Sequence, residues 1–213
     1  MYCSMIGFYN YTVILTYLSL MVSVGGLFFA ASGYIDQAIL CLLISGFLDL
    51  FDGKVARTKK DRTEQEKNFG IQIDSLTDVI CFGALPALIA YMTGMRAIWQ
   101  IVILMLFVLC GMIRLAYYNV TEQERQASTA EVRKSYCGLP ITSSALIVPL
   151  VYIFRSLMAE QVFLTVLTIV MLTCAIAFVT PIRVRKPHGR SIAALVLFGP
   201  ALAGLFLIPR IVN

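Results

Sequence analysis

Long apolar segments recur along the whole chain, and they constrain its fold more than any other feature of the sequence. One segment contains the run IVILMLFVLCGMI, which has no polar residue at helical spacing. About 20 apolar residues are enough for a helix to cross the hydrocarbon core of a bilayer. A water-soluble bundle would instead need a polar face on each helix. The pattern therefore predicts an all-α integral membrane protein, folded as a polytopic helical bundle.

Seven transmembrane helices are expected. To within a few residues they cover 11–32, 36–56, 70–93, 97–119, 138–158, 161–181 and 191–209. The composition agrees, because charged residues make up 14% of the 213 residues, against about 25% in a soluble domain. The opening stretch MYCSMIGFYN lacks the basic region of a signal peptide, so the first span is expected to be retained.

Basic residues are distributed very unevenly over the two sides of this predicted bundle. Fourteen of the seventeen Lys and Arg residues fall within 54–67, 114–134 and 183–190, which would all lie on one side. Because loops rich in Lys and Arg stay in the cytoplasm, we expect this side and the N-terminus to be cytoplasmic, in the plasma membrane of a prokaryote. The basic face would meet anionic lipid headgroups, and no nucleic-acid partner is expected.

Four aspartates lie where two of the predicted spans meet the cytoplasm. Asp49 and Asp52 are three residues apart, and Asp74 and Asp78 are four apart, so each pair shares one helix face. The short loop between the spans makes them antiparallel neighbours, and the two pairs can face each other. Crowded carboxylates repel in a low dielectric unless cations join them, and Mg²⁺ or Mn²⁺ suits their oxygens. We predict a two-metal site; the alternative is four aspartates that only cap helix ends.

Small residues accompany these acids. Gly53 and Ala56 continue the face of the first acidic pair, and Gly70 lies one turn before the second pair. Missing side chains let a ligand or another helix approach closely, although ordinary helix packing would also use glycine here. Arg57 follows at the water interface, where a guanidinium can hold a phosphate through two hydrogen bonds.

The stretches DLFDGKVAR at 49–57 and GIQIDSLTD at 70–78 together resemble the signature of the CDP-alcohol phosphotransferases. The polar loop between them, TKKDRTEQEKNF, is a few residues longer than the usual family pattern. Three further segments are similar to segments of the phosphatidylserine synthases in that family, namely DSLTDVICFGALPA, CGMIRLAYYNV and YCGLPITSSA. The resemblance covers most of the chain and is strongest over 45–145.

The resemblance implies a single membrane-embedded domain over 1–213, with the six-helix family core at about 8–181 and an extra span at about 191–209. It implies transfer of a phosphatidyl group from CDP-diacylglycerol to the hydroxyl of L-serine, with release of CMP, by a homodimer. Two divalent ions, Mg²⁺ or Mn²⁺, would be held by Asp49, Asp52, Asp74 and Asp78, and Asp78 would also be the general base. The residues implied for binding CDP and its phosphates are Gly53, Ala56, Arg57 and Gly70.

The acceptor side is less clearly marked. We predict that Arg114 binds the serine carboxylate and that Asn119, a little further along, contacts the amino acid. Arg133 and Lys134 could instead hold an acceptor phosphate, which leaves glycerol 3-phosphate and inositol phosphate as alternative acceptors. The polar run 142–144 either faces the cleft or makes hydrogen bonds between helices. An ion-coupled transporter is a more distant alternative, since ionisable residues in spans often line ion pathways.

Overall fold

The computed structural model describes residues 7–56, 58–59, 61–128, 135–181 and 183–185. Its α-helices are α1 (Ile14–Ala31), α2 (Ile35–Ala56), α3 (Glu64–Asp78), α4 (Leu85–Thr93), α5 (Ile98–Ser128), α6 (Ser144–Ile153) and α7 (Glu160–Val179). A two-stranded antiparallel ladder pairs β1 (Ser135–Cys137) with β2 (Arg183–Arg185), with Tyr136 opposite Val184. Apart from this ladder, the described part of the chain is helical, as the sequence predicts.

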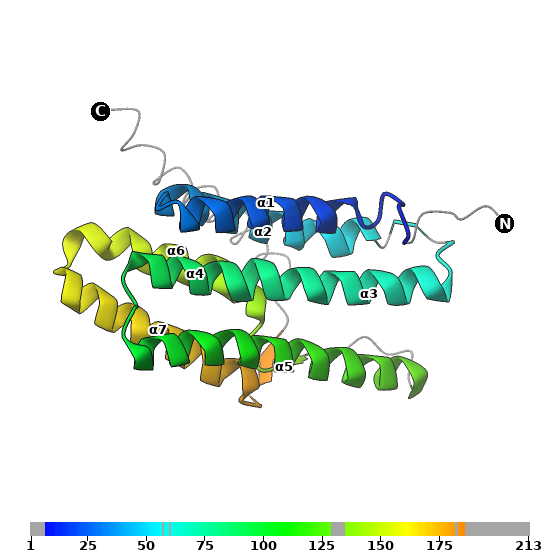
Figure 1. The fold of residues 1–213 in the computed structure, drawn as a ribbon. Helices are drawn as coiled ribbons and strands as arrows, with labels where there is room; N and C mark the ends of the chain where they lie inside the picture. Colours follow the sequence, from blue (N-terminus) through cyan, green and yellow to red (C-terminus); the bar gives the residue numbers. More distant parts are fainter. Residues whose placement is uncertain (1–6, 57, 60, 129–134, 182, 186–213) are drawn as a thin grey trace.

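The helices stack in layers (Figure 1). α1 and α2 form a hairpin on one side, α3 and α4 run through the middle, and α5 and α7 pack together on the other side. The turn of the hairpin contains Gly33 with φ of +84°, a left-handed conformation that glycine adopts without strain. A Cβ on Gly26 would come within 2.8 Å of the Cys41 Cβ, so the missing side chain lets α1 and α2 approach closely.

Helices α3 and α4 are two parts of one longer helix, joined by the π-helical segment Val79–Ala84. Pro86 lies just after this segment and has no N–H to donate to the Phe82 carbonyl in an α-helical register. That carbonyl accepts a hydrogen bond from the Ser144 hydroxyl at 2.8 Å, which ties α6 to the middle layer. Ser143 donates to the Pro140 carbonyl at 2.6 Å. These two hydroxyls of the polar run 142–144 therefore bond to backbone carbonyls.

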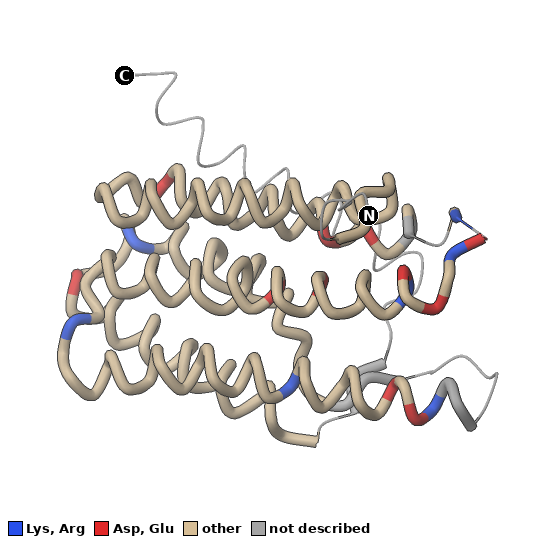
Figure 2. Tube along the Cα trace, turned by 45° about the vertical axis from the view of Figure 1, so that its right-hand side comes forward, with Lys and Arg blue, Asp and Glu red and all other residues tan. Residues whose placement is uncertain are grey.

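The outer surface has the character of a lipid-facing surface. Large apolar side chains are widely exposed on it, among them Met21, Phe28, Ile98 and Ile169. Most of the charged residues coloured in Figure 2 lie toward the ends of the helices, with long uncharged stretches between them. Four helices are long and apolar enough to cross a membrane: Ile14–Ala31, Glu64–Thr93, Ile98–Arg125 and Glu160–Val179. The chain is an integral membrane protein.

Seven spans are not found among the described residues. Helix α2 is long enough, but it carries four charged residues, Asp36, Asp49, Asp52 and Lys54, and so fails on composition. The predicted span 138–158 folds as the ten-residue α6 between the short 3₁₀ turns Ile141–Ser143 and Phe154–Leu157. The predicted span 191–209 lies outside the described residues, and the single-domain boundaries stay a prediction.

Two helices also extend further into the polar sequence than the spans predicted from hydropathy. α3 begins at Glu64 because Thr63 caps it: the Thr63 hydroxyl accepts from the Glu66 N–H, and the Glu66 carboxylate accepts from the Thr63 N–H. α5 continues to Ser128, where Arg125 and Glu122 form an ion pair at 2.6 Å, one turn apart. Hydropathy alone cannot locate such ends, because they depend on capping and charge pairs.

Candidate functional site

The aspartates of α2 and α3 form the centre of the candidate site. One carboxylate oxygen each from Asp49, Asp74 and Asp78 lies within 4.8 Å of the other two. Asp78 is buried, with 7% of its surface exposed, and the other two are half-buried. The four-residue spacing of Asp74 and Asp78 places both on one face of α3, and the packing of α3 and the following π segment against the α1–α2 hairpin brings Asp49 beside them.

Asp52 lies next to this three-carboxylate group. Its Oδ2 atom accepts a hydrogen bond from the Thr16 hydroxyl of α1 at 3.4 Å, and its side chain lines the same cavity as that of Asp74. The structure therefore brings all four predicted aspartates into one neighbourhood, with three of them closest together. That Asp52 is also a metal ligand stays a prediction.

The donor set of this group fits a hard divalent cation. Oxygens bound to one such ion at about 2.0–2.6 Å lie within about 5 Å of one another, and the three carboxylates already approach that separation. Carboxylate oxygens are preferred ligands of Mg²⁺ and Mn²⁺, whereas Zn²⁺ and copper more often bind imidazole or thiolate groups. The residues that could hold an ion are Asp49, Asp74 and Asp78, with Asp52 nearby in the cavity that Asp74 also lines.

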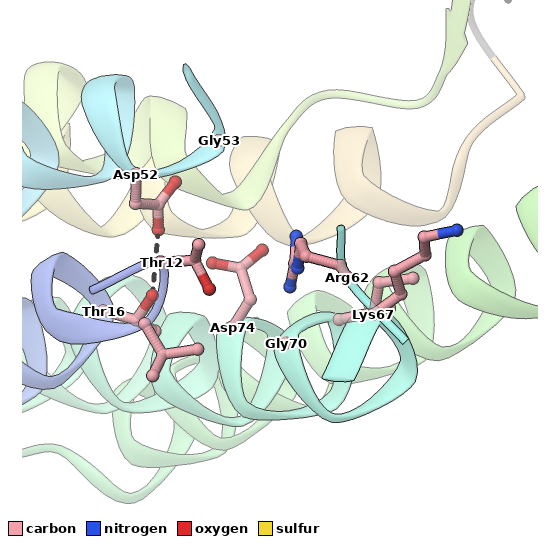
Figure 3. A pocket seen from close by; sticks show the side chains of 10 residues that line it. Thr12, Thr16, Asp52, Gly53, Arg62, Lys67, Gly70 and Asp74 are labelled. Atoms are coloured by element: carbon pink, nitrogen blue, oxygen red, sulfur yellow. Dashed lines mark hydrogen bonds between the residues drawn. The ribbon is translucent and has the colours of Figure 1, made fainter. Parts of the chain in front are cut away.

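A cavity of about 170 Å³ opens beside the aspartates. Residues from the segment before α1, from α1, α2 and α3, and from the loop before α3 line it (Figure 3): Thr12, Val13, Thr16, Asp52, Gly53, Arg62, Lys67, Gly70, Ile71 and Asp74. Two of the residues predicted for nucleotide binding, Gly53 and Gly70, are thus in its wall. Ala56 is the last residue of α2, and its side chain is outside the part of the structure described; Arg57 also lies outside the described residues.

Four polar residues of this cavity were not predicted from the sequence, namely Thr12, Thr16, Arg62 and Lys67. Thr16 is a buried polar residue in an otherwise apolar helix, which is a weak signal for a role at the site. Arg62 and Lys67 looked like ordinary members of the basic loop that sets membrane orientation. Only the three-dimensional structure distinguishes these two residues from the other basic residues, because it places them in the cavity wall.

On the opposite side of the aspartates, α5 contributes polar residues. The positive charge of Arg114 acts on Asp78, and its guanidinium lies 5.9 Å from the centre of the Tyr118 ring. The Asn119 side chain donates a hydrogen bond to the Ser75 hydroxyl of α3 at 2.8 Å. Two of the four residues predicted for the acceptor side, Arg114 and Asn119, are therefore near α3. Arg133 and Lys134 lie outside the described residues.

Comparison with known proteins identifies a family that matches most of the chain. Residues 9–180 match the family described as CDP-alcohol phosphatidyltransferase. The chain is 35% identical over 124 residues to the CDP-diacylglycerol–serine O-phosphatidyltransferase of Saccharomyces cerevisiae, covering 57% of this chain and 44% of the yeast protein. The Helicobacter pylori protein of the same description (strain 26695) is 35% identical over 144 residues, 67% of this chain and 56% of its own length.

A third relative, from Bacillus subtilis and with the same description, is 25% identical over 162 residues, which are 75% of this chain and 80% of that protein. The chain thus spans about half the length of the yeast and Helicobacter relatives that it matches.

The carboxylate group leads to a prediction about metal binding. Mn²⁺ should raise the thermal midpoint of the purified protein by roughly a few degrees, because a ligand that binds only the folded state stabilises it. Asp74→Asn should lose most of this shift, since it removes an anionic oxygen from the group. Asp61→Asn, a charge-matched change at an exposed loop residue, should keep it. A full Mn²⁺ shift in Asp74→Asn would exclude the cluster as the metal site.

Proposed function

This chain belongs to the CDP-alcohol phosphatidyltransferase family, whose match covers residues 9–180, and from that premise we propose that it transfers a phosphatidyl group from CDP-diacylglycerol to L-serine. The products would be phosphatidylserine and CMP. The observation that carries the proposal is the Asp49/Asp74/Asp78 group beside a polar, glycine-lined cavity at one end of a lipid-exposed bundle. The descriptions of the yeast, Helicobacter and Bacillus relatives support serine as the acceptor.

The family uses divalent metal ions, and the aspartate group fits them. Such ions would neutralise the diphosphate and stabilise the attacking and leaving oxygens. We propose that Asp49, Asp74 and Asp78 hold the first ion and that Asp52 completes a site for two, as Mg²⁺ or Mn²⁺. Four carboxylates close together in a low dielectric are more stable with that amount of positive charge.

The binding of the donor follows from the walls of the cavity. The diphosphate would lie against the aspartates, and the nucleotide would lie on the side of Gly53 and Gly70, which line the cavity. Ala56 and Arg57 continue this side in the sequence, and we assign them to the same nucleotide contacts. The two acyl chains would remain among the lipids, against the exposed apolar faces of the helices.

Asp78 is proposed as the general base. It lies one turn beyond Asp74 on α3 and is the most buried of the three clustered aspartates. Its carboxylate would take the proton of the serine hydroxyl, since a hydroxyl is a poor nucleophile until that proton is removed. The serine oxygen would then bond to the lipid-linked phosphorus, and the bond from that phosphorus to the bridging oxygen would break. CMP would leave with the electron pair of that bond.

The acceptor would bind on the α5 side of the aspartates. Arg114 can hold the serine carboxylate by a charge-assisted, two-pronged contact, and its charge already acts on Asp78. Asn119, hydrogen-bonded to Ser75, lies on the same side of α3 and could orient the amino acid. Glycerol 3-phosphate and inositol phosphate remain the alternative acceptors, and Arg133 and Lys134 would be the cations for their phosphate.

Acceptor identity is tested by CMP release from CDP-diacylglycerol in proteoliposomes with Mn²⁺. Serine should support release, and glycerol 3-phosphate or inositol phosphate should be at least roughly tenfold slower, because a site built for one polar acceptor leaves its groups unpaired with another. Asp49→Asn is the inactive control. If glycerol 3-phosphate is the faster acceptor, the serine assignment is wrong although the family chemistry stands.

The role of Asp78 is tested by separating turnover from binding. Asp78→Asn should lower turnover by about 10²–10⁴-fold, the usual contribution of a positioned base. Its affinity for CDP-diacylglycerol should fall only modestly, because the other three aspartates remain. Asp52→Asn, proposed to remove a ligand to the ions, should weaken binding as well. Equal losses of affinity in the two variants would make Asp78 an ordinary ligand.

The site is proposed to open to the cytoplasm, in the plasma membrane of a prokaryote, with the N-terminus inside. The basis is the excess of Lys and Arg on the side of the 54–67 loop. In a cysteine-free background, a thiol at position 60 should react with a membrane-impermeant reagent only after permeabilisation. A thiol at position 156 should react in intact cells, and the reverse pattern would overturn the orientation. The homodimer implied by the resemblance stays a prediction.

A further inference from the structure

The loop before α3 brings a cationic side chain, Arg62, to the cavity, and this residue lies outside the stretches 49–57 and 70–78 that resemble the family signature. Arg62 lies just before the N-cap residue Thr63, and its side chain lines the same cavity as Asp52 and Asp74. Its Nη2 atom donates a hydrogen bond to the Glu66 carbonyl oxygen at 3.1 Å. The side chain is half-buried, and so its position is set by the surrounding protein.

The Glu66 carboxylate holds together the segments on either side of Arg62. Its Oε1 atom accepts hydrogen bonds from Asn10 at 2.9 Å and from Lys59 at 2.8 Å. Its Oε2 atom accepts from the Thr63 N–H at 2.9 Å. One carboxylate therefore joins the segment before α1, the loop and the first turn of α3. This network ties Lys59 and Thr63 to Glu66, and the side chain of Arg62, between them, lies against the first turns of α3.

Gly70 provides the space that Arg62 occupies. A Cβ at this position would come within 2.6 Å of the Arg62 Nη2 atom, closer than real side-chain contacts allow. Figure 3 shows the Arg62 guanidinium and the Asp74 carboxylate pointing toward each other across the cavity. The glycine of the second half of the signature thus accommodates a guanidinium in this chain, one turn before the first aspartate of α3.

Lys67 also lines the cavity but directs its charge elsewhere. Its Nζ atom forms an ion pair with the Glu64 carboxylate at 2.7 Å, and 49% of its side chain is exposed. In Figure 3 its ammonium group points away from Asp74. The two basic residues of the cavity therefore differ: the guanidinium faces the aspartates, and the ammonium faces water.

The Arg62 guanidinium lies beside Gly70 of α3, and this position indicates which part of the substrate it contacts. Gly70, Asp74 and Asp78 follow one another at single turns, so about 12 Å of helix separates Gly70, beside which the guanidinium lies, from the proposed base. In an in-line displacement the attacking and leaving oxygens lie on opposite sides of the phosphorus. With the serine hydroxyl at Asp78, the leaving group lies toward Gly70.

We propose that Arg62 binds the phosphate of the departing CMP, an assignment that rests on the proposed function. Its planar guanidinium can donate two parallel hydrogen bonds to phosphate oxygens. The phosphate gains negative charge as the bond to the lipid-linked phosphorus breaks, so a cation at this point stabilises the leaving group. The lengthened loop of this chain thereby supplies a nucleotide contact.

The test compares ligands with and without the phosphate on the purified full-length protein in the presence of Mn²⁺. Arg62→Gln should weaken CMP binding by roughly tenfold to hundredfold, the loss expected for a charge-assisted hydrogen bond to phosphate. Cytidine, measured by competition, should bind as before and so reports that the site is folded. Arg62→Lys should recover part of the affinity. Lys67→Gln is the control inside the same cavity and should change CMP affinity by less than about threefold, as for an exposed ion pair.

Three results would overturn the assignment. Arg62→Gln could weaken cytidine and CMP equally, which would make Arg62 structural. It could raise the KM for serine and leave CMP affinity unchanged, which would place Arg62 at the acceptor. Lys67→Gln could weaken CMP binding as much as Arg62→Gln, which would mean that both residues act only through their positive charge and that neither contacts the phosphate specifically. A wild-type protein that binds CMP in this Arg62-dependent way but transfers nothing to serine would refute the proposed acceptor and keep the Arg62 assignment.

Discussion

The mutual repulsion of carboxylates at the buried ends of helices is the constraint on which the rest of this structure depends. Asp49, Asp74 and Asp78, of which one is buried and two are half-buried, bring oxygens within 4.8 Å of one another, and such a group is costly without compensating partners. Neighbouring polar groups offset only part of this cost: Thr16 donates to the adjacent Asp52, and the charge of Arg114 acts on Asp78. A cation-binding role explains why so unfavourable a group exists, since a purely structural bundle gains nothing from it.

Much of this arrangement could be predicted from the sequence, because it depends on local spacing. The intervals between Asp49 and Asp52 and between Asp74 and Asp78 place each pair on one helix face, whatever the tertiary fold. The contacts of Arg62 and Thr16 could not be predicted in the same way. Arg62 lies in a loop that Glu66 ties to the segment before α1, more than 50 residues away, and Thr16 meets Asp52 through helix packing.

The number of spans was harder to predict for two separate physical reasons. In α2 the aspartates of the site add charge to an otherwise apolar helix, so function conflicts with the composition expected of a membrane helix. In the region 138–158, Pro149 lies inside α6, and 3₁₀ turns at both ends limit the α-helix to ten residues. A window of apolar residues does not detect these interruptions, because proline and glycine cost little in average hydropathy but change the hydrogen-bond ladder.

The stripe Gly70, Asp74 and Asp78 also suggests how one helix can serve reactants of opposite character. Its outer turn meets the polar loop, where Arg62 lies over Gly70, and its inner turn is followed at once by the π-helical segment. π turns inside α-helices are frequent at functional sites because they reorient the side chains around them. In the proposed reaction, the water-soluble CMP would leave by the outer turn, while the acceptor would meet Asp78 from the side of α5. The product lipid would stay beside the apolar surface of the bundle. The direction of the helix, from aqueous loop to buried turn, would thus separate the two products by their solubility.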